Sequence, residues 1–566
     1  MQLSELETIR REKLQQLRNL GINPYPADLY PVTDTSKKIK DNFEEGKKVV
    51  VAGRLMSRRI QGSASFAELQ DADGRIQVYF NRDEICKGED KTHYNEVYKK
   101  LLDIGDFIGI EGELFKTKVG EKTIMVKNFT LLSKALKPLP QPRVDADGKT
   151  HDAFTDPEQR YRQRYADLVV NPHVKEIFVK RTKLFNAMRT FFNECGYFEV
   201  ETPILQPIPG GAAARPFVTH HNALDIPLYM RIANELYLKR LIVGGFDGVY
   251  EFSKNFRNEG MDRTHNPEFT AMEIYVSYKD YNWMMDFCEQ LLEFCAIEVN
   301  GTSKATFGKH EIDFKAPYPR VTMAEAIQNF TGFDITGKTE DEIRKAALDM
   351  KIPVDDTMGK GKLIDEIFGE KCEGNYIQPT FITDYPKEMS PLCKEHRENP
   401  ELTERFELMV CGKEIANAYS ELNDPIDQRE RFEAQLKLAD RGDDEATAFI
   451  DYDFLRALEY GMPPTSGMGI GMDRLVMFLT NNASIQEVLF FPQMRPEKKK
   501  VEMTEDEKTV YTLLKANTPI ALETLKTQSG LSNKKWDKAI KGLTASKVAK
   551  VERTEESLMV VVFIGL

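Results

Sequence analysis

A polar stretch between two apolar ones concentrates charged side chains of the kind that bind anions. Residues 255–269 read NFRNEGMDRTHNPEF and lie between VYEFSK and FTAMEIYVSY, which are rich in β-branched and aromatic residues. This pattern predicts two strands joined by a long connection. The connection carries Arg257, Glu259, Arg263 and His265, more patterned charge than a surface loop requires. Because arginine stays charged and grips phosphate through two donors, the loop is suited to binding a phosphate-containing ligand.

A further arginine follows a run of glycines. The segment GMGIGMDRLVMFL, at 467–479, places Arg474 at the beginning of a predicted helix. Its glycines follow the pattern GxGxG, and a loop, YGMPPTS, precedes them instead of a clear strand, so a dinucleotide-binding fold is not predicted. Small residues here let a ligand approach the backbone. An isolated arginine at a helix start is more often structural, but beside the charged loop it indicates a clamp on a polyphosphate.

Two acidic residues seven positions apart form a third candidate group. They are Glu414 and Glu421, in the segment CGKEIANAYSELNDPIDQ. On a helix or a slightly bulged strand they would face the same way. Mg²⁺ accepts carboxylates together with phosphate oxygens, so we expect these two residues to share a magnesium ion. Two exposed acids in salt bridges are the alternative.

The composition describes a folded, acidic protein. The 566 residues carry a net charge of -12 and are 41% hydrophobic, which fits three or four domains with substantial cores. The acidic balance argues against non-specific coating of nucleic acid, although local basic patches remain compatible with a specific RNA or DNA. Seven cysteines without a CxxC pair indicate neither a disulfide framework nor a zinc site.

Membrane and export signals are not expected. No apolar run approaches the ~20 residues that span a bilayer. The first residues, MQLSELETIRREKLQQLRNL, have helical spacing but lack the apolar core of a signal peptide, and their acids do not suit a transit peptide. We therefore expect a cytoplasmic protein.

Changes of pattern divide the chain into parts that must position these residues. Five short strands with one inserted helix, near 92–102, match the count of an OB-fold, with another small β-barrel as the rival. A Pro- and Asp-rich tract reads as a linker, and the long mixture of helices and strands that follows reads as one large domain with a helix-rich insertion at 323–370. We expect an N-terminal helical segment at 1–45, the barrel at 46–135, the linker at 136–151, the large domain at 152–497 and a C-terminal domain at 502–566.

The C-terminal part reads as three helices followed by two strands, which suggests a winged helix. Between 531 and 553, six lysines and one arginine oppose two acids. A nucleic-acid-binding face and a solvated helix in a small interaction module are both compatible with this local charge.

Three segments, in order, resemble the signature motifs of class II aminoacyl-tRNA synthetases. GYFEVETPILQPIPGGAAARPF looks like motif 1 and its sequel, FRNEGMDRTHNPEF looks like motif 2, and GMGIGMDR looks like motif 3. RYRQRYADL and the preceding barrel resemble the lysine, aspartate and asparagine subgroup, with lysyl-tRNA synthetases the nearest type over about Ser4–Pro496. The resemblance implies an α+β multidomain protein with an OB-fold that binds the anticodon and a catalytic domain built on an antiparallel sheet.

The resemblance also assigns roles around ATP. Arg257 would contact the α-phosphate and the amino-acid carboxylate, and Glu259 the adenine. Arg263 and His265 would hold the outer phosphates, while Arg474 would cover the base and reach the γ-phosphate. The residues expected at the ATP site are Arg257, Glu259, Arg263, His265, Asn266, Phe269, Glu414, Gly471 and Arg474, with Arg257 and Arg474 catalytic, Phe269 stacked on the base, and Glu414 and Glu421 binding Mg²⁺.

The amino acid is expected to be lysine. A lysine enzyme needs carboxylates and room for four methylenes; here Pro216 stands where the aspartate type has Asp, and Glu235 where it has Gln. By resemblance, Glu235 and Glu273 would lie near the α-amino group, and Tyr275 would receive the ε-ammonium with Glu421. The expected lysine-binding residues are Gly211, Glu235, Arg257, Glu273, Tyr275, Asn417, Tyr419, Glu421 and Gly469. Tyr419 replaces the usual Phe, and Asn234 the usual Pro.

On the barrel, RRIQGSASFAELQDADGRIQVYF resembles the anticodon-binding face of the family. Phe66 would stack on a base, with Arg59 and Gln77 nearby, and stacking contributes ~1–3 kcal/mol per base. By composition alone, Phe66 would more often belong to the barrel core.

The resemblance implies lysine, ATP, tRNA-Lys and a second copy of the chain as partners. The motif 1 helix and strand, Val174–Thr202, form the dimer interface in the family. Three alternatives remain: a sister enzyme for aspartate or asparagine, a ligase that attaches lysine to a protein, and an RNA-binding or signalling protein on an inactive scaffold. The segment 502–566 lies outside the usual bacterial match, and we expect Lys534, Lys535, Lys538 and Lys541 to add affinity for tRNA.

Overall fold

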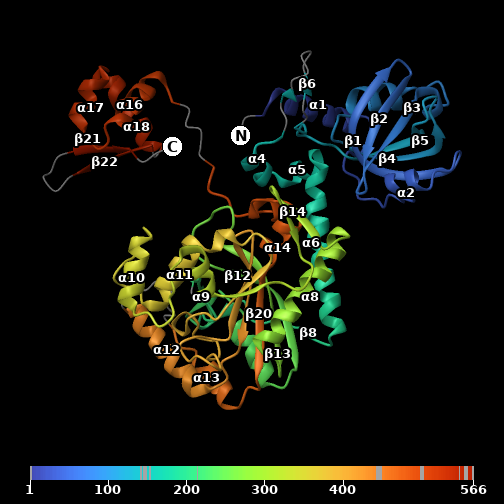
Figure 1. Ribbon diagram of the computed structural model, residues 1–566. Helices are drawn as coiled ribbons and strands as arrows, with labels where there is room; N and C mark the ends of the chain where they lie inside the picture. Colours follow the sequence, from blue (N-terminus) through green and yellow to red (C-terminus); the bar gives the residue numbers. More distant parts are fainter. Residues whose placement is uncertain are drawn as a thin grey trace. The chain divides into compact units, whose positions relative to one another are not determined.

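The computed structural model describes residues 3–140, 143–144, 150–151, 154–212, 214–440, 449–497, 503–546, 548–553 and 559–563. The chain forms two compact units, 1–492 and 493–566 (Figure 1). Of the tract expected as a linker at 136–151, the described residues are 136–140 and the short strands β6 (Arg143–Val144) and β7 (Thr150–His151). Among the described residues, no helix has the length and apolar character needed to cross a membrane.

The chain begins with helix α1 (Glu5–Asn19). Ser4 and Glu7 form a reciprocal capping box at its start, which satisfies two backbone donors. Gly21, with a φ of 75°, follows its end and directs the chain away. The short helix α2 (Ser36–Asp41) precedes the barrel.

The five predicted barrel strands are confirmed. They close in the order β1-β2-β3-β5-β4, and along β2 and β3 buried residues alternate with partly exposed ones, the period of two that a barrel wall requires. The strands are β1 (Lys48–Gln61), β2 (Ala64–Gln70), β3 (Arg75–Asn81), β4 (Phe107–Lys116) and β5 (Lys122–Ser133), with α3 (Arg82–Ile85) and the π-helical segment η1 (His93–Leu101) inserted between β3 and β4. This is the topology of an OB-fold.

An eight-stranded sheet forms the centre of the large domain. Its order is β16-β17-β18-β19-β20-β13-β12-β8, and only the two outermost pairs are parallel. The predicted hairpin is confirmed as β12 paired antiparallel with β13. The strands are β8 (Phe198–Glu199), β12 (Gly248–Phe256), β13 (Glu268–Ser277), β16 (Arg320–Thr322), β17 (Thr380–Thr383), β18 (Arg405–Val410), β19 (Lys413–Ser420) and β20 (Thr465–Gly471).

The glycine-rich segment differs from its prediction. Residues 465–471 form strand β20 between β13 and β19, where a loop and a helix start were expected, and helix α14 (Met472–Leu479) begins directly afterwards. Glycine has low strand propensity, so the pattern did not indicate a strand. Met468 and Ile470 face the core, and the alternating glycines face the other way.

Helices cover both faces of this sheet (Figure 1). The long helices α6 (Pro172–Glu194) and α8 (Tyr281–Asn300) pack with α14 and the sheet in the largest hydrophobic core. The expected helical insertion consists of α9 (Met323–Thr331), α10 (Glu340–Asp349) and α11 (Lys360–Lys371), which share a smaller core. The remaining elements of the large domain are α4 (Pro157–Arg162), α5 (Arg164–Val170), β9 (Leu205–Gln206), β10 (Val218–His221), β11 (Ile226–Met230), α7 (Glu235–Val243), β14 (Lys304–Phe307), β15 (His310–Asp313), η2 (Glu373–Asn375), η3 (Lys387–Met389), α12 (Pro425–Asp440), α13 (Tyr452–Glu459) and α15 (Ile485–Val488).

The second unit contains three helices and a small antiparallel sheet. The helices are α16 (Glu505–Ala516), α17 (Leu522–Ser529) and α18 (Asn533–Ala545), and the strands β21 (Ile520–Ala521), β22 (Ala549–Arg553) and β23 (Met559–Phe563) pair in the order β21-β23-β22. Trp536, Ala539 and Leu543 place one face of α18 in the core of this unit.

Candidate active site

A cavity of about 620 Å³ lies on one face of the central sheet, a size typical of small-ligand sites. Side chains from β12, β13, β19 and β20, the β12–β13 connection and the start of α7 and α14 line it. It includes these residues predicted from the sequence: Gly211, Glu235, Arg257, Glu259, His265, Asn266, Phe269, Glu273, Tyr275, Glu414, Asn417, Tyr419, Gly469, Gly471 and Arg474. Segments more than 200 residues apart in the chain therefore meet at one site.

The glycines of β20 keep the floor of the cavity open. A Cβ atom placed on Gly467 would lie 2.3 Å from Glu421 Oε1 and 2.4 Å from Tyr275 Cε1, too close for any side chain. Gly467 thus lets an acidic and an aromatic residue approach the backbone of the strand. The GxGxG pattern follows from the period of two along a strand whose alternate positions face the cavity.

A bulge in β19 brings Glu414 onto the cavity face. Glu407 pairs with Asn417, but the register shifts between Leu408 and Met409, so that Met409 pairs with Glu414. This shift lets residues an odd number of positions apart line the same cavity.

The end of the cavity near the β12–β13 connection is basic. Arg257 lies over the Phe269 ring, 5.0 Å from its centroid, and Arg257 Nε is buried with no hydrogen-bond partner among the described residues. Arg474 donates to the Glu414 carbonyl at 2.9 Å, and its Nη2 lies 3.2 Å from His265 Nε2. Burial lowers the pKa of Arg257 from its ordinary value, against the opposing pull of nearby carboxylates. An anionic ligand would relieve this burial cost.

The opposite end is acidic. Lys239, fully buried on α7, forms ion pairs with Glu235 and with Glu421. Tyr419 donates to Glu235 at 2.7 Å, and Tyr275 donates to Glu273 at 3.0 Å. Glu273 lies close enough to Glu235 and Glu421 for their charges to interact, while Lys239 pairs with only two of the three carboxylates. This leaves a negative excess suited to a cationic ligand.

The pKa values of two of these carboxyl groups, Glu273 and Glu421, are raised. Burial, together with the charge of Glu235, raises the pKa of Glu273 to about 7. Burial also raises the pKa of Glu421 well above its ordinary range, although Lys239 opposes this shift. Carboxyl groups in this state gain most when a ligand brings a second positive charge.

Glu421 does not share a metal ion with Glu414, which corrects the prediction. The two residues stand at opposite ends of β19, and seven residues of strand extend on the order of 20 Å. Ligands of one Mg²⁺ lie within ~4 Å of each other. Glu421 instead pairs with Lys239 at the acidic end, where its carboxylate lies against Gly467 in the floor of the cavity.

Glu407, which sequence reasoning missed, is the acid that accompanies Glu414. It lines the cavity and accepts a hydrogen bond from Arg405 at 2.5 Å. Burial raises the pKa of Glu407 to about 7, and the charge of Glu414 adds to the shift. The two acids also stand seven apart, but the two-residue turn Cys411–Gly412, with φ of 50° and 64°, folds them back onto each other. A tight turn between two apolar runs was the available signal.

The side chains of two other residues singled out in the sequence, Arg263 and Asn234, do not line the cavity. The main chain of Arg263 belongs to the β12–β13 connection, but its side chain does not line the cavity. Asn234, one of the departures from the family pattern, is buried beneath the site, where it donates to Glu251 at 2.9 Å and accepts from Ser253 at 3.3 Å. Asn234 therefore supports the floor without facing a ligand.

The barrel carries a second hollow. Arg59, Phe66 and Gln77 line it, from three different strands. Arg59 lies directly opposite Phe66, and Gln77 opposite Glu68. Phe66 is partly exposed and packs against Tyr79 at 4.8 Å between ring centroids, so it belongs to the outer face and not to the barrel core.

Two known families match this chain, one over the large domain and one over the barrel. Residues 156–495 match the family described as tRNA synthetases class II (D, K and N), and residues 49–132 match the OB-fold nucleic acid binding domain. The chain belongs to the class II tRNA synthetases of the D, K and N group, and it is a ligase.

Among curated relatives, the chain is similar to several proteins named lysine–tRNA ligase. A lysine–tRNA ligase of Christiangramia forsetii is 78% identical over 557 residues, 98% of each chain. One from Porphyromonas gingivalis is 70% identical, covering 88% of this chain and 87% of the relative. Another, from Azobacteroides pseudotrichonymphae, is 65% identical over 499 residues, 88% of this chain but 99% of the relative.

Proposed function

We propose that this chain activates L-lysine with ATP to form lysyl-adenylate and pyrophosphate, then transfers lysine to the 3′ end of tRNA-Lys. The observation that carries the proposal is the polarity of one cavity. Its acidic end brings Glu235, Glu273 and Glu421 together with one basic side chain, that of Lys239, while its basic end holds Arg257 and Arg474. An amino acid with a second ammonium group fits the first end, and a nucleotide polyphosphate fits the other.

The first step requires positioning more than acid–base chemistry. A carboxylate oxygen of lysine attacks the α-phosphorus in line, a new P–O bond forms, and the bond to the bridging oxygen of pyrophosphate breaks. Arg257 belongs to the basic end but lies close enough to Glu273 for that carboxylate to affect its pKa, so one guanidinium can hold the carboxylate and the α-phosphate together. Arg474 and His265 neutralise charge on the outer phosphates. The ribose 3′-hydroxyl of tRNA then accepts the lysyl group.

The substrate's two ammonium groups occupy different acids in this proposal. Glu235 and Glu273 receive the α-ammonium, beside Gly211. Tyr275 and Glu421 receive the ε-ammonium, and the ring of Tyr419 lies along the methylenes. Asn417 is held by Arg405, whose Nε donates to its Oδ1 at 3.1 Å, and it faces the substrate carboxylate.

Mg²⁺ fits this site at the pair Glu407 and Glu414. Both line the cavity on its basic side, and the raised pKa of Glu407 marks an acid that lacks full neutralisation. Two carboxylates that complete their coordination with phosphate oxygens form a typical magnesium site. When bound there, Mg²⁺ would supply charge neutralisation for the pyrophosphate leaving group.

We also propose the division of labour along the chain. The barrel, 46–135, follows the helical segment 1–45 and binds the anticodon through Arg59, Phe66 and Gln77. The segment 152–497 carries catalysis, joined by the linker 136–151. The unit beyond 502 is winged-helix-like, since three helices and a small sheet in this order are typical of that fold.

A homodimer is the proposed assembly. Strand β8 is the outermost strand of the central sheet, and Val179, Phe198 and Leu205 expose apolar side chains on and near motif 1. An edge strand beside exposed apolar residues is a surface that a second copy would cover.

Charging of tRNA tests the complete function. Radiolabelled lysine, aspartate and asparagine are each offered with ATP and tRNA-Lys, and with tRNA-Asp as the control. Label from lysine alone, on tRNA-Lys alone, is the expected result. Label on protein instead of tRNA would identify the protein-modifying ligase, and label from aspartate or asparagine would identify a sister enzyme.

A further inference from the structure

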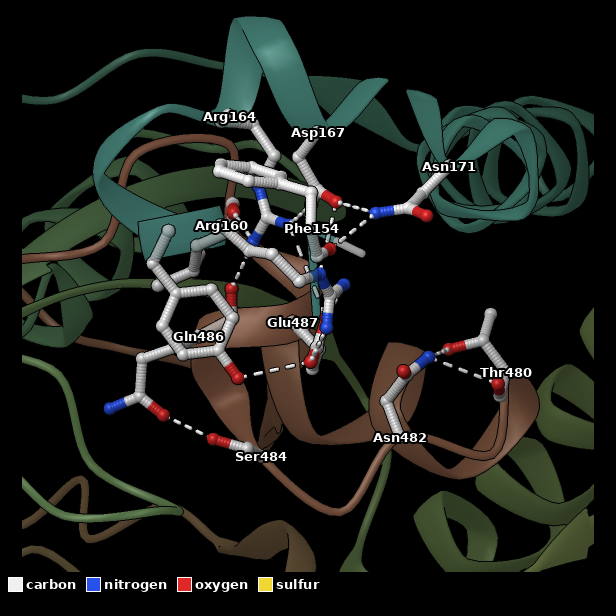
Figure 2. Close-up of polar contacts among 12 residues, drawn as sticks. Phe154, Arg160, Arg164, Asp167, Asn171, Thr480, Asn482, Ser484, Gln486 and Glu487 are labelled. Carbon is white, nitrogen blue, oxygen red and sulfur yellow. Dashed lines mark hydrogen bonds and ion pairs between the residues drawn. The ribbon is translucent and has the colours of Figure 1, made fainter. Parts of the chain in front are cut away.

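A largely buried cluster of charged residues joins two neighbouring short helices to a third that is distant in the sequence (Figure 2). Helices α4 and α5 lie at the start of the large domain, and α15 lies near its end. Arg160 on α4 makes two hydrogen bonds to the carboxylate of Glu487 on α15, both at 2.9 Å. Tyr161 donates to the same carboxylate at 3.0 Å. The paired geometry fixes the orientation of α15 as well as its position.

The cluster is closed on its other side by Asp167. This carboxylate accepts from Arg160 at 2.9 Å, from Arg164 at 2.6 Å and from Asn171 at 2.7 Å. Arg164 is fully buried and also donates to the main-chain oxygen of Gln486 at 2.7 Å. Each buried charge thus has a partner, which makes the arrangement rigid.

Helix α15 in turn holds the loop between β12 and β13. The main-chain N–H of Ile485 donates to the Arg263 carbonyl at 2.7 Å. The amide of Gln486 donates from Nε2 to the Asp262 carbonyl at 2.9 Å. Ser484 donates to Gln486 Oε1, which directs the amide NH₂ group of Gln486 toward the loop.

The turn held in this way carries the basic end of the site. Asp262 Oδ1 accepts from the main-chain N–H groups of Thr264 and His265 at 2.6 and 2.8 Å, and Asp262 Oδ2 lies 2.8 Å from His265 Nδ1. His265 then meets Arg474 across the cavity. The contacts run without a gap from α4 to the residues that face the outer phosphates.

We propose that Gln486 is a positioning residue for the triphosphate of ATP, held in place by the Arg160–Glu487 and Arg164–Asp167 pairs. The proposal deepens the function above and rests on it. Gln486 touches no substrate; it fixes the main chain of the turn that presents His265. The KM for lysine should not depend on Gln486. The acidic end is built from α7, β13 and β19, and none of these elements makes the contacts described here.

The test measures lysine-dependent ATP–pyrophosphate exchange in full-length variants. Gln486→Ala removes one hydrogen bond to a carbonyl and should raise the KM for ATP about threefold to tenfold, with the KM for lysine within twofold of wild type. Gln486→Lys keeps a donor at this point and should restore most of the affinity for ATP. Glu487→Gln, one step further away, should act in the same direction with a smaller effect.

Matched controls separate positioning from general damage. Gln378 also donates from Nε2 to a main-chain oxygen, that of Glu311, at 2.8 Å. Neither residue lines the cavity, so Gln378→Ala should leave both KM values unchanged. Asp83→Asn likewise weakens a two-bond pair, with Arg82 on the barrel, and should also leave both KM values unchanged. An unchanged KM for ATP in Gln486→Ala, or equal rises in both KM values, would overturn the proposal. Absence of exchange in the wild type would instead reject the proposed function.

Discussion

In the proposed reaction Arg257 connects the two halves of the chemistry, because it lines the basic end of the cavity and is also influenced by Glu273 of the acidic end. Its residue type and neighbourhood were predictable from the charged stretch at 255–269. The role of Glu407 was not predictable in this way, since a lone acid in the apolar run FELMVC reads as the outer side of a strand. Only the turn at 411–412 shows that Glu407 and Glu414 approach each other. Lys239 was missed for a similar reason: a lysine on a helix is usually exposed.

Removing Arg257 should mainly affect the chemical step. Arg257→Ala is expected to reduce lysine-dependent exchange at least ~10²-fold, the scale of losing one preorganised donor. Arg257→Lys keeps the charge but loses the paired donors, so an intermediate loss is expected. Exchange measured at saturating lysine and ATP provides the comparison. A rate within a few-fold of wild type for Arg257→Ala would remove this residue from its assigned role.

Lysine binding should depend on pH through Glu273. Its pKa is raised to about 7 in the free protein, so below pH 7 a proton must leave before the carboxylate can pair with an ammonium group. The apparent Kd for lysine should rise roughly tenfold per pH unit below 7. Calorimetric titration between pH 5.5 and 8 measures this dependence. In Glu273→Gln the dependence should flatten and the binding weaken; a wild-type Kd that is constant over the range would contradict the assignment.

Ionisation of Glu273 favours lysine binding but lowers the free energy of unfolding of the unliganded protein. Because the pKa of Glu273 is raised in the folded protein, its contribution to stability is present below the unfolded value of about 4.5 and is lost as the pH rises through about 7. Glu273→Gln should therefore raise the free energy of unfolding of the unliganded protein at pH 8, by up to ~3 kcal/mol. Denaturant unfolding at pH 8 without lysine measures it. A less stable variant under these conditions would show that the carboxylate is not under strain.

Among the elements, the barrel and the β12–β13 hairpin followed from the sequence, because alternating burial and clear turn residues specify them. Strand β20 did not. Its glycines satisfy the needs of the cavity and oppose strand propensity, so local pattern and final structure disagree at a functional position. The bulge in β19 was likewise not predictable, because nothing in IANAYS indicates the shift in register. The shift places Glu414, Asn417 and Tyr419 on one face.

Strand β20 offers a test of the floor of the cavity. Gly467→Ala places a Cβ atom against Glu421 and Tyr275, and overpacking of this kind costs ~1–3 kcal/mol. The KM for lysine should therefore rise tenfold or more. Gly471→Ala serves as the comparison, because its nearest neighbour would be 3.8 Å away and its effect on lysine should be much smaller. Similar KM values for lysine in the two variants would contradict the steric account.

For the whole molecule, the family and the order of parts were predictable, since three motifs and a barrel appear in sequence. The C-terminal unit is separate in structure and in sequence. It forms its own compact unit, and the synthetase family match ends at residue 495. A relative covered almost completely by 499 residues also leaves 12% of this chain without a counterpart. The unit therefore lies beyond the region that the synthetase family matches.

The lysines of α18 should affect tRNA and not activation. Lys534, Lys535, Lys538 and Lys541 are exposed on the helix whose opposite face carries Trp536. Replacing all four by Gln should raise the KM for tRNA and flatten its dependence on salt, because fewer counterions are released. Exchange without tRNA should stay at the wild-type rate. Charging kinetics at 50 and 200 mM salt measure both effects; an unchanged KM and slope would leave α18 as a face for another partner.

The central claim is that one cavity selects lysine and activates it with ATP. Amino-acid-dependent ATP–pyrophosphate exchange, run separately with lysine, aspartate and asparagine and without tRNA, tests it most directly. Exchange with lysine alone is predicted, because only lysine carries a second ammonium group to meet the excess of carboxylates. Exchange with aspartate or asparagine would contradict the assignment of the acidic end, and no exchange with any of the three, from folded protein, would contradict the account of the site as a whole.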